Sequence, residues 1–403
     1  MNFVGPILAF AATAVLIILL RPLAIAVGLV DVPTSRKSHS GNIPLIGGMA
    51  IFVGSLVALA TQSSLVQTEV VISAPLPAFF AAAFVLILVG AWDDYADLPP
   101  AARIVAQIIA CLIMIFGGDT VLIDLGQLNI DGSIFSLGWL AVPFTVFACL
   151  GVINAMNMCD GVDGLSGSLA LIALLGLGIA NTLWGSAGDQ HLIVVFAACV
   201  ISFLMFNLRT LWRSKAWVFL GDAGSMLLGL TLSWLAISLS QGEERVISPA
   251  AALWFLMLPV YDAVSMMVRR LVKRRSPFRA DREHLHHIFL MAGFSVGESV
   301  TLMSGIAVTG VVIGLGGVYL EIADGLLAAL FLVGGTLYHW AIRRAWRVMR
   351  FLRRSICRRT KADRRSRADR RHGGESGYSG AERRSGPDRR RQAARRTGND
   401  QAF

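Results

Sequence analysis

The sequence predicts an all-α, polytopic integral membrane protein with about eleven transmembrane helices. Of its 403 residues, 55% are hydrophobic and only 15% are charged. Uninterrupted apolar runs of about twenty residues, long enough to cross a bilayer as a helix, recur along the chain. The first run lacks a basic preceding segment and a small-residue cleavage site, so we interpret it as a retained helix and not as a signal peptide. The runs cover residues 3–21, 45–61, 76–92, 101–117, 138–156, 165–184, 191–208, 222–240, 248–268, 299–319 and 324–342.

Lysine and arginine residues divide the predicted loops into two classes. The loops after the second, fourth, sixth, eighth and tenth helices contain one basic residue, Arg245. Because cytoplasmic loops are enriched in Lys and Arg, the asymmetry predicts an N-terminus outside and a C-terminus in the cytoplasm. The loops after the first, third, seventh and ninth helices contain Arg36, Lys37, Arg209, Arg213, Lys215 and the cluster at 269–282.

Composition separates a membrane domain, residues 1–342, from a basic cytoplasmic tail, residues 343–403. The tail contains 21 Lys and Arg against six Asp and Glu, a local charge of +15, so the net charge of +10 leaves residues 1–342 at −5. Few tail residues could form a core, which predicts disorder. A solvated tail is one interpretation, and contact of its arginines with anionic lipid headgroups is the other.

Three aspartates lie at the end of the third predicted helix, in the segment WDDYADL. Asp93 lies four residues and Asp94 three residues before Asp97, so a continuing helix would bring these carboxylates together. Charge at the rim of a bilayer is costly, which makes such residues functional candidates. Like charges this close repel unless a cation lies between them, although ordinary acidic residues at a solvated helix end would show the same spacing.

Oxygen donors also end the fifth predicted helix, in the segment NAMNMCDGVDG. Asn154, Asn157 and Asp160 are spaced by three residues and share a helix face. Gly161 and Gly164 allow a sharp turn and a close approach of backbone to a ligand. Mg²⁺ prefers oxygen ligands and keeps water and substrate phosphate in its shell, so one or two donors per segment suffice. The pattern is therefore compatible with a magnesium site.

A further aspartate precedes the eighth predicted helix, in the segment FLGDAGS. Asp222 lies among glycines at a helix N-terminus, a combination that suits a metal-bound phosphate. The alternative is that Asp222 only caps the N-terminus of that helix. Both interpretations place it on the predicted cytoplasmic side, with the two preceding acidic segments.

Three histidines follow a dense basic run in the segment RRLVKRRSPFRADREHLHH. Arg279 and Arg282 could each hold phosphate oxygens at two points, and His284, His286 and His287 could donate to the same anion or to a sugar. The cationic neighbours disfavour a zinc site. A basic loop that only fixes topology would explain the arginines but not the histidines. Acids that suit a hard metal and a basic, histidine-rich loop on one surface together fit a diphosphate substrate.

With these segments, the chain resembles the polyprenyl-phosphate N-acetylhexosamine-1-phosphate transferases, glycosyltransferase family 4. The likeness covers residues 28–297 and rests on five blocks in order: DVPTSRKSHSGNIPLIGG, WDDYADL, NAMNMCDGVDG, VFLGDAGS and SPFRADREHLHH. IPLIGG and HLHH are similar to the WecA-like branch, whereas the phospho-MurNAc-pentapeptide transferases typically have PTMGG and HHH. The arginine-rich tail departs from the family pattern.

The resemblance implies transfer of a sugar 1-phosphate, GlcNAc-1-phosphate being the usual one, from a UDP-sugar to undecaprenyl phosphate. UMP is released, and the lipid-diphosphate sugar starts a cell-surface polysaccharide such as lipopolysaccharide O antigen. The implied cofactor is Mg²⁺, with Mn²⁺ as a substitute, and the implied place is the bacterial cytoplasmic membrane, with the active site on its cytoplasmic face. A homodimer is compatible with this reading, and no nucleic acid partner is expected.

Site residues follow from the resemblance by motif match. Asp93, Asp94 and Asp160 are the expected catalytic residues, and the first two would orient or deprotonate the lipid phosphate. Asn157 and Asp222 are the expected metal ligands. The nucleotide sugar is expected to contact Asp163, Phe219, Arg279, Arg282, His284, His286 and His287, and the lipid phosphate is expected to contact Arg103, Lys37 and His39.

Three alternatives stay open. A phospho-MurNAc-pentapeptide transferase belongs to the same superfamily. A transporter or flippase would place its ionisable residues near the bilayer midplane in broken helices of two repeated halves, whereas here they gather at one rim. A CDP-alcohol phosphotransferase is a further enzyme class, but its aspartate signature is missing.

Overall fold

The computed structural model describes residues 3–32, 41–65, 75–129, 131–185, 187–209, 213, 215–274 and 284–347. All of them belong to one compact unit, residues 1–349. Four predicted site residues, Lys37, His39, Arg279 and Arg282, lie outside the described residues, as does the chain beyond Arg347. What the sequence predicts for these residues stays a prediction.

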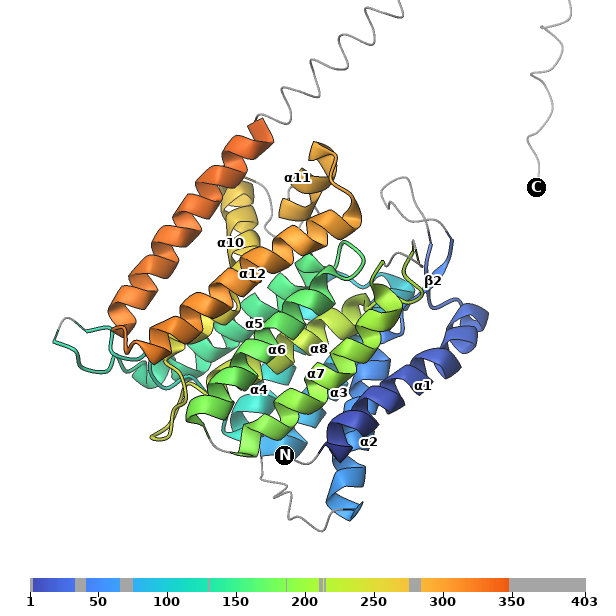
Figure 1. Cartoon of the computed structure of the whole chain (residues 1–403), viewed down its shortest axis with the longest axis horizontal. Coiled ribbons are helices and arrows are strands. Elements are labelled where there is room, and N and C mark those ends of the chain that lie inside the picture. Colours follow the sequence, from blue (N-terminus) through green and yellow to red (C-terminus); the bar gives the residue numbers. More distant parts are fainter. Residues whose placement is uncertain are drawn as a thin grey trace, which may run out of the picture. The chain divides into compact units, whose positions relative to one another are not determined.

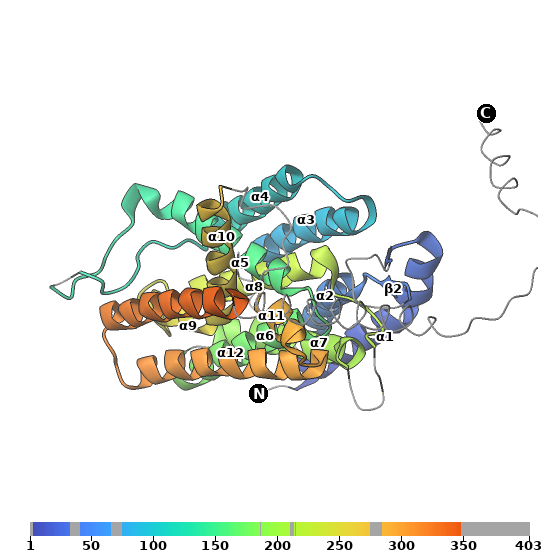
Figure 2. The same ribbon diagram turned by 90° about the horizontal axis from the view of Figure 1, so that it is seen from above.

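The described part of the chain is all-α apart from one pair of two-residue strands, which confirms the predicted fold class. β1 (Val30–Asp31) and β2 (Ile43–Pro44) pair in antiparallel fashion. α11 (Leu285–Ala292) lies at the same end of the bundle as the C-terminal ends of α10 (Met257–Val272) and of the final helix, Asp324–Arg347 (Figures 1 and 2). The helices are α1 (Val4–Val27), α2 (Gly47–Leu65), α3 (Pro75–Ala96), α4 (Pro100–Gly118), the short 3-10 helix η1 (Gly138–Leu140), α5 (Ala141–Cys159), α6 (Leu165–Trp184), α7 (Ala187–Asn207), α8 (Gly221–Ser238), α9 (Pro249–Phe255), α10 (Met257–Val272), α11 (Leu285–Ala292), α12 (Val296–Tyr319) and a final helix, Asp324–Arg347.

The apolar runs predicted from the sequence all coincide with helices. Within the described residues, eight helices are long and apolar enough to cross a membrane, or nine if the bent pair α9 and α10 forms one span. α2 and α8 account for the other two runs, so the chain is a multi-pass membrane protein.

The run at 248–268 is not one helix, as the sequence suggested, but two. α9 and α10 meet at Leu256 with a bend of 85°. Pro259 lies in the first turn of α10, where the backbone N–H that proline lacks would have no partner in the helix. Inside one continuous helix, the same proline would remove a backbone hydrogen bond. The bend turns α10, which carries Asp262, Arg269 and Arg270, toward α5.

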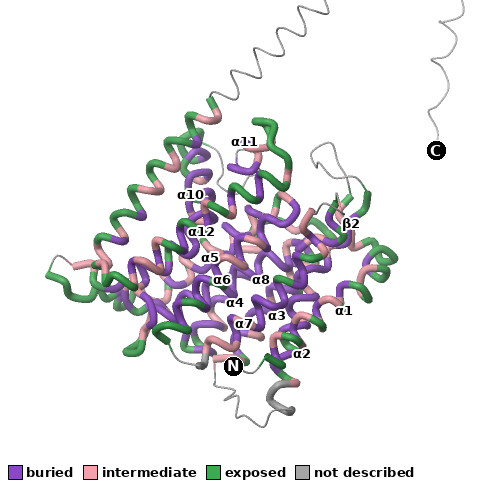
Figure 3. The backbone as a smooth tube through the Cα atoms, viewed as in Figure 1, coloured by how far each residue is buried: buried purple, intermediate pink, exposed green. Residues whose placement is uncertain are grey.

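α8 is the central helix of the bundle and is buried along almost its whole length, within the purple core of Figure 3. Glycines let two neighbouring helices approach its first turn. A Cβ added to Gly48 of α2 would lie 2.3 Å from Cα of Gly224. One added to Gly90 of α3 would lie 2.3 Å from Cα of Ala223. Since no side chain fits at either position, these contacts fix the N-terminus of α8, which carries Asp222, between α2 and α3.

Backbone hydrogen bonds join the segments that precede α2 and α8. The Phe219 N–H donates to the Pro44 carbonyl at 2.8 Å, and the Gly47 N–H donates to the Phe219 carbonyl at 2.9 Å. The Gly48 N–H donates to the Leu220 carbonyl at 3.0 Å. The start of α8 is therefore held by backbone pairing as well as by helix packing.

Candidate active site

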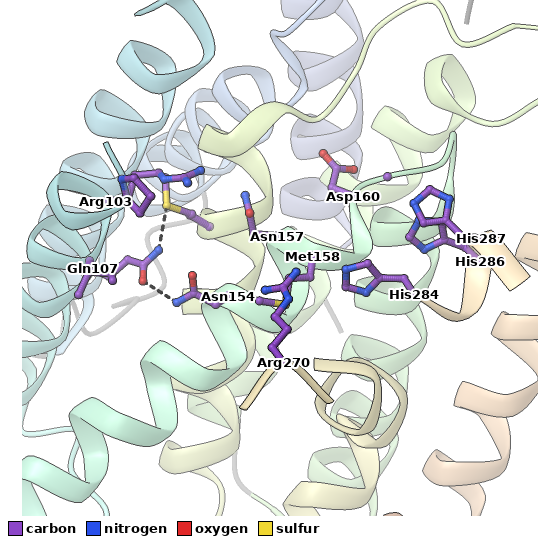
Figure 4. A pocket seen from close by; sticks show the side chains of 14 residues that line it. Arg103, Gln107, Asn154, Asn157, Met158, Asp160, Arg270, His284, His286 and His287 are labelled. Atoms are coloured by element: carbon purple, nitrogen blue, oxygen red, sulfur yellow. Dashed lines mark hydrogen bonds between the residues drawn. The ribbon is translucent and has the colours of Figure 1, made fainter. Parts of the chain in front are cut away.

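A cavity of about 310 Å³ lies among α4, the end of α5, α8, α10 and the start of α11. In Figure 4, Arg103 and Gln107 lie on one side and the histidines on the other, with Asn157 and Asp160 between them. The cavity thus joins segments that are far apart in the sequence. Six predicted site residues line it: Arg103, Asn157, Asp160, His284, His286 and His287.

Arg103 bridges two of the predicted acids at the edge of the cavity. Its Nη1 lies 2.9 Å from Asp93 Oδ2 and 3.4 Å from Asp222 Oδ2. Asp93 is almost fully buried, and its other oxygen accepts the Leu98 N–H at 2.7 Å. Asp222 also accepts a hydrogen bond from Asn157 Nδ2 at 2.6 Å. The positive charge of Arg103 therefore compensates the negative charges of two carboxylates. A phosphate bound at Arg103 would compete with these carboxylates for its guanidinium group.

Asp94 caps the N-terminus of α8 from a different helix. Its Oδ1 accepts the Asp222 N–H at 2.9 Å, and its Oδ2 accepts the Ala223 N–H at 3.4 Å. Gly221 is in the left-handed region with φ of 74°, and a Cβ there would lie 2.4 Å from Asp94 Oδ2. The alternative that Asp222 caps its own helix is wrong, because Leu220 is the N-cap residue of α8 and Asp222 lies inside the first turn, where its carboxylate contacts Arg103 and Asn157.

The turn after α5 brings an acid and a histidine to the same place. Asp160 ends α5, and a Cβ added to Gly161 would lie 2.8 Å from His286 Nε2. The missing side chain at Gly161 therefore leaves room for this imidazole beside the turn. Desolvation raises the pKa of the Asp160 carboxyl well above its ordinary value, and the negative charges of Asp222 and Asp94 raise it further. A bound cation would relieve that repulsion.

A buried carboxylate on α10 holds the first histidine. Asp262 Oδ2 lies 2.8 Å from His284 Nδ1, and Asp262 Oδ1 accepts the Leu285 N–H at 3.2 Å. The Tyr338 hydroxyl donates to the same oxygen at 2.9 Å. The sequence prediction missed Asp262, although a single acid inside the apolar run WFLMLPVYDAVSMM was a signal for it.

The other two histidines pack against the first. The rings of His284 and His286 are stacked, with centroids 5.5 Å apart, and those of His286 and His287 are 4.2 Å apart. Burial lowers the pKa of His286 to about 3, and the neighbouring His287 and His284 contribute to the shift. His286 is therefore neutral near pH 7 and offers a hydrogen bond to a ligand, not a positive charge.

The polar residues at the cavity offer oxygen donors for a metal ion, without forming a complete cage. Within the described ranges, no three His, Cys, Asp or Glu side chains form a ready cage. Asp222, Asp160 and Asn157 still offer the oxygen donors that Mg²⁺ prefers, and Mg²⁺ needs only one or two carboxylates when substrate phosphate and water complete its shell. The Asn157 amide nitrogen faces Asp222, and a half turn of that amide would present its oxygen instead. The donor types fit a magnesium ion shared with a substrate.

Two predicted nucleotide contacts do not line the cavity. Asp163 accepts from Arg209 Nε at 2.7 Å and from the Ala216 N–H at 3.4 Å. Phe219 takes part in the backbone pairing before α8. Conversely, Gln107 and Arg270 line the cavity but were not predicted. The spacing of four residues between Arg103 and Gln107 was the signal for Gln107, because it places both on one helix face.

Comparison with known proteins gives one consistent result. The model of the family Glycosyl transferase family 4 matches residues 76–240, which contain the acidic segments and Arg103. The undecaprenyl-phosphate alpha-N-acetylglucosaminyl 1-phosphate transferase of Escherichia coli O157:H7 is 35% identical over 348 residues, 86% of this chain and 92% of the relative. The proteins of the same name from Salmonella typhi and Haemophilus influenzae are 36% and 34% identical, with 92% and 95% of the relative covered.

The chain belongs to glycosyl transferase family 4. The resemblance drawn from the five sequence blocks is thereby confirmed. Family membership also favours a transferase over the transporter and the CDP-alcohol phosphotransferase that the sequence left open. The cavity of this family member places two arginines, the Asp160 carboxylate and three histidines around one space.

Proposed function

We propose that the chain transfers N-acetylglucosamine 1-phosphate from UDP-N-acetylglucosamine to undecaprenyl phosphate and releases UMP. The observation that carries the proposal is the opposition of two walls in one cavity. One wall holds Arg103, which pairs with Asp93 and Asp222, and the other holds the histidines at the start of α11 (Figure 4). The names of the relatives support the acceptor and the sugar.

The reaction needs two phosphates to meet at one place. An oxygen of the lipid phosphate attacks the β-phosphorus of the nucleotide sugar, a new P–O bond forms, and the bond from that phosphorus to UMP breaks. The lipid phosphate is a monoester with a second pKa of ≈ 6, so it is already largely ionised near pH 7 and a strong base is not required. Positioning and charge neutralisation therefore provide most of the catalysis.

Each wall of the cavity has a part in this scheme. Arg103 holds the lipid phosphate, while His284 and His286 donate to the diphosphate or to the sugar. Asp222 and Asn157 would hold Mg²⁺, and the bound ion would supply charge neutralisation for the phosphates. Asp93 keeps Arg103 in place, because the two side chains are 2.9 Å apart and Asp93 is buried.

In a bacterial cytoplasmic membrane, this scheme requires a definite orientation. Eleven spans with the N-terminus outside place α11 and the acidic segments on the cytoplasmic face, where UDP-sugars are found. The distribution of Lys and Arg in the loops supports that orientation. Contact of the tail with anionic lipid and formation of a homodimer belong to the same proposal.

The test is turnover by purified full-length protein in detergent. The protein is incubated with undecaprenyl phosphate, Mg²⁺ and one nucleotide sugar at a time, and UMP release and the lipid product are measured. UDP-N-acetylglucosamine should give turnover, and UDP-MurNAc-pentapeptide should not. Turnover of the pentapeptide substrate alone would overturn the choice of sugar. Full activity in EDTA would contradict the metal requirement without contradicting the transfer reaction. Loss of activity in EDTA and its restoration by Mg²⁺ or Mn²⁺ would support the metal requirement.

A further inference from the structure

Gln107 has a buried donor with a poor partner inside the cavity. The residue is 2% exposed, and its Oε1 accepts from Asn154 Nδ2 at 2.7 Å. Its Nε2 donates to the thioether sulfur of Met226 at 3.3 Å (Figure 4). Asn154 Nδ2 also donates to the Leu150 carbonyl at 2.8 Å, so both N–H groups of Asn154 are used. The network therefore sets the Gln107 amide with its oxygen toward Asn154 and its nitrogen toward Met226.

A thioether is a weak hydrogen-bond acceptor. Buried amide donors normally meet an oxygen, because a poorly satisfied donor costs desolvation free energy. The Gln107 amide is held by Asn154 in a direction that serves no strong acceptor within the described residues, and it lines the cavity. Such a donor suits an oxygen that enters the cavity with a substrate.

The helix that carries Gln107 indicates which substrate. Gln107 lies one turn after Arg103 on the same face of α4. The outer face of α4 is apolar and open, with Val105 54% and Ile109 44% exposed, as expected for a face toward lipid. The histidines that suit the nucleotide sugar lie on the opposite side of the cavity (Figure 4). Val105 and Ile109 lie on the face of α4 opposite to Arg103 and Gln107, so this helix separates the lipid from the cavity. A lipid phosphate that enters the cavity around α4 would reach the side that carries Arg103 and Gln107.

We infer that Gln107 is a binding residue for the polyprenyl phosphate acceptor, with its Nε2 donating to a phosphate oxygen that Arg103 also contacts. A charged phosphate oxygen is a far stronger acceptor than the sulfur it replaces. The inference rests on the proposed function, because it takes the acceptor to be a lipid phosphate. The competing role is a brace, in which Gln107 only ties α4 to α5 and α8.

Two substitutions at this position and one control separate the roles. Gln107→Leu removes the donor at similar size. Gln107→Glu keeps the shape and an oxygen for Asn154, but it removes the donor and adds a charge that repels phosphate. Met226→Leu removes the sulfur that accepts from Gln107 Nε2. It should change kcat/KM and Tm little if a substrate oxygen replaces that sulfur during the reaction. For each variant, steady-state kinetics are measured with undecaprenyl phosphate varied at saturating nucleotide sugar and then in the reverse arrangement, and thermal unfolding is followed in detergent.

Gln107→Leu should lower kcat/KM for undecaprenyl phosphate about tenfold to a hundredfold, as expected for one hydrogen bond to a charged group. Gln107→Glu should lower it further, and kcat/KM for the nucleotide sugar should change much less in both. A lipid kcat/KM of Gln107→Leu within about twofold of wild type would overturn the inference. So would equal losses for both substrates together with a lower Tm in Gln107→Leu and Met226→Leu, since a brace predicts that result. Absence of turnover by the wild type would instead overturn the proposed function, independently of Gln107.

Discussion

The Asp262 carboxylate lies 2.8 Å from His284 Nδ1 and is almost fully buried beneath the start of α11. A carboxylate at this nitrogen keeps a proton on Nδ1, so that Nε2 is the ring atom that can meet a ligand. The same carboxylate accepts the Leu285 N–H and the Tyr338 hydroxyl. One acid on α10 thus determines both where α11 begins and how its first histidine is turned.

Substitution of Asp262 should impair use of the nucleotide sugar. In Asp262→Asn the shape is kept but the charge that orients His284 is lost, so kcat/KM for UDP-N-acetylglucosamine should fall about tenfold or more. Apparent affinity for undecaprenyl phosphate should change little. Tyr338→Phe is the matched control, because it removes one hydrogen bond from the same carboxylate and leaves the charge. Equal kinetics in Asp262→Asn and wild type would show that His284 does not need this partner.

Asp94 should act on stability through α8. Loss of a helix cap costs about 0.5–2 kcal/mol, and Asn retains one acceptor for the two backbone N–H groups that Asp94 serves. The Tm in detergent should therefore fall in the order wild type, Asp94→Asn, Asp94→Ala. Activity should fall in the same order, since Asp222 lies in the capped turn. The exposed Asp97, changed to Asn, serves as the control and should leave both quantities unchanged, because Asn tolerates its φ of 55°.

The charge group around Arg103 should show coupling between its members. Arg103→Gln leaves Asp93 buried without its cation, so the Tm should fall by an amount corresponding to roughly 1–3 kcal/mol. Adding Asp93→Asn removes the uncompensated charge, and the double variant should be more stable than Arg103→Gln alone. Both variants should lose affinity for undecaprenyl phosphate. Purely additive losses of Tm in the double variant would argue that the pair does not interact.

The helices could be predicted because the bilayer imposes a length and an apolar composition on each span. Spacing within one helix was also informative, as for Arg103 and Gln107, which are four residues apart. The break between α9 and α10 was missed, because hydropathy is continuous across it and only Pro259 marks it. Periodicity reports which residues share a face, but it does not report where a helix bends.

Contacts between distant segments lay beyond sequence reasoning. Asp94 caps a helical turn 128 residues later in the chain, and neither segment contains a sequence pattern that predicts this contact. Asp94 could therefore be predicted as a functional residue, but not as the cap of α8. The histidine segment was identified by its composition, whereas the pairing of His284 with Asp262 depends on the fold, which places α10 beside the start of α11.

His286 should make the protein less stable in mild acid. Its pKa is about 3 in the folded protein, because the ring is buried, against an ordinary value of 6.5. Below pH 6.5 the His286 ring binds a proton in the unfolded chain, whereas in the folded protein it binds one only near pH 3. The free energy of unfolding is therefore unaffected by this residue above pH 6.5, and it should fall as the pH drops through that window by up to ~1.4 kcal/mol per unit.

The measurement is thermal unfolding of full-length protein in detergent at pH 7.5, 6.5, 5.5 and 4.5 (chosen to bracket the ordinary histidine pKa of roughly 6.5). His286→Gln is the matched variant, because glutamine carries no proton-dependent charge and places an amide where Nε2 lies. The Tm of the wild type should fall more steeply between pH 6.5 and 4.5 than that of His286→Gln, while the two curves should run parallel above pH 6.5. Titrating groups that do not interact with His286 contribute equally to both proteins and cancel, so the difference reports His286 together with its neighbours His284 and His287. Parallel curves over the whole range would mean that His286 titrates normally in the folded protein and carries a positive charge toward the cavity in mild acid.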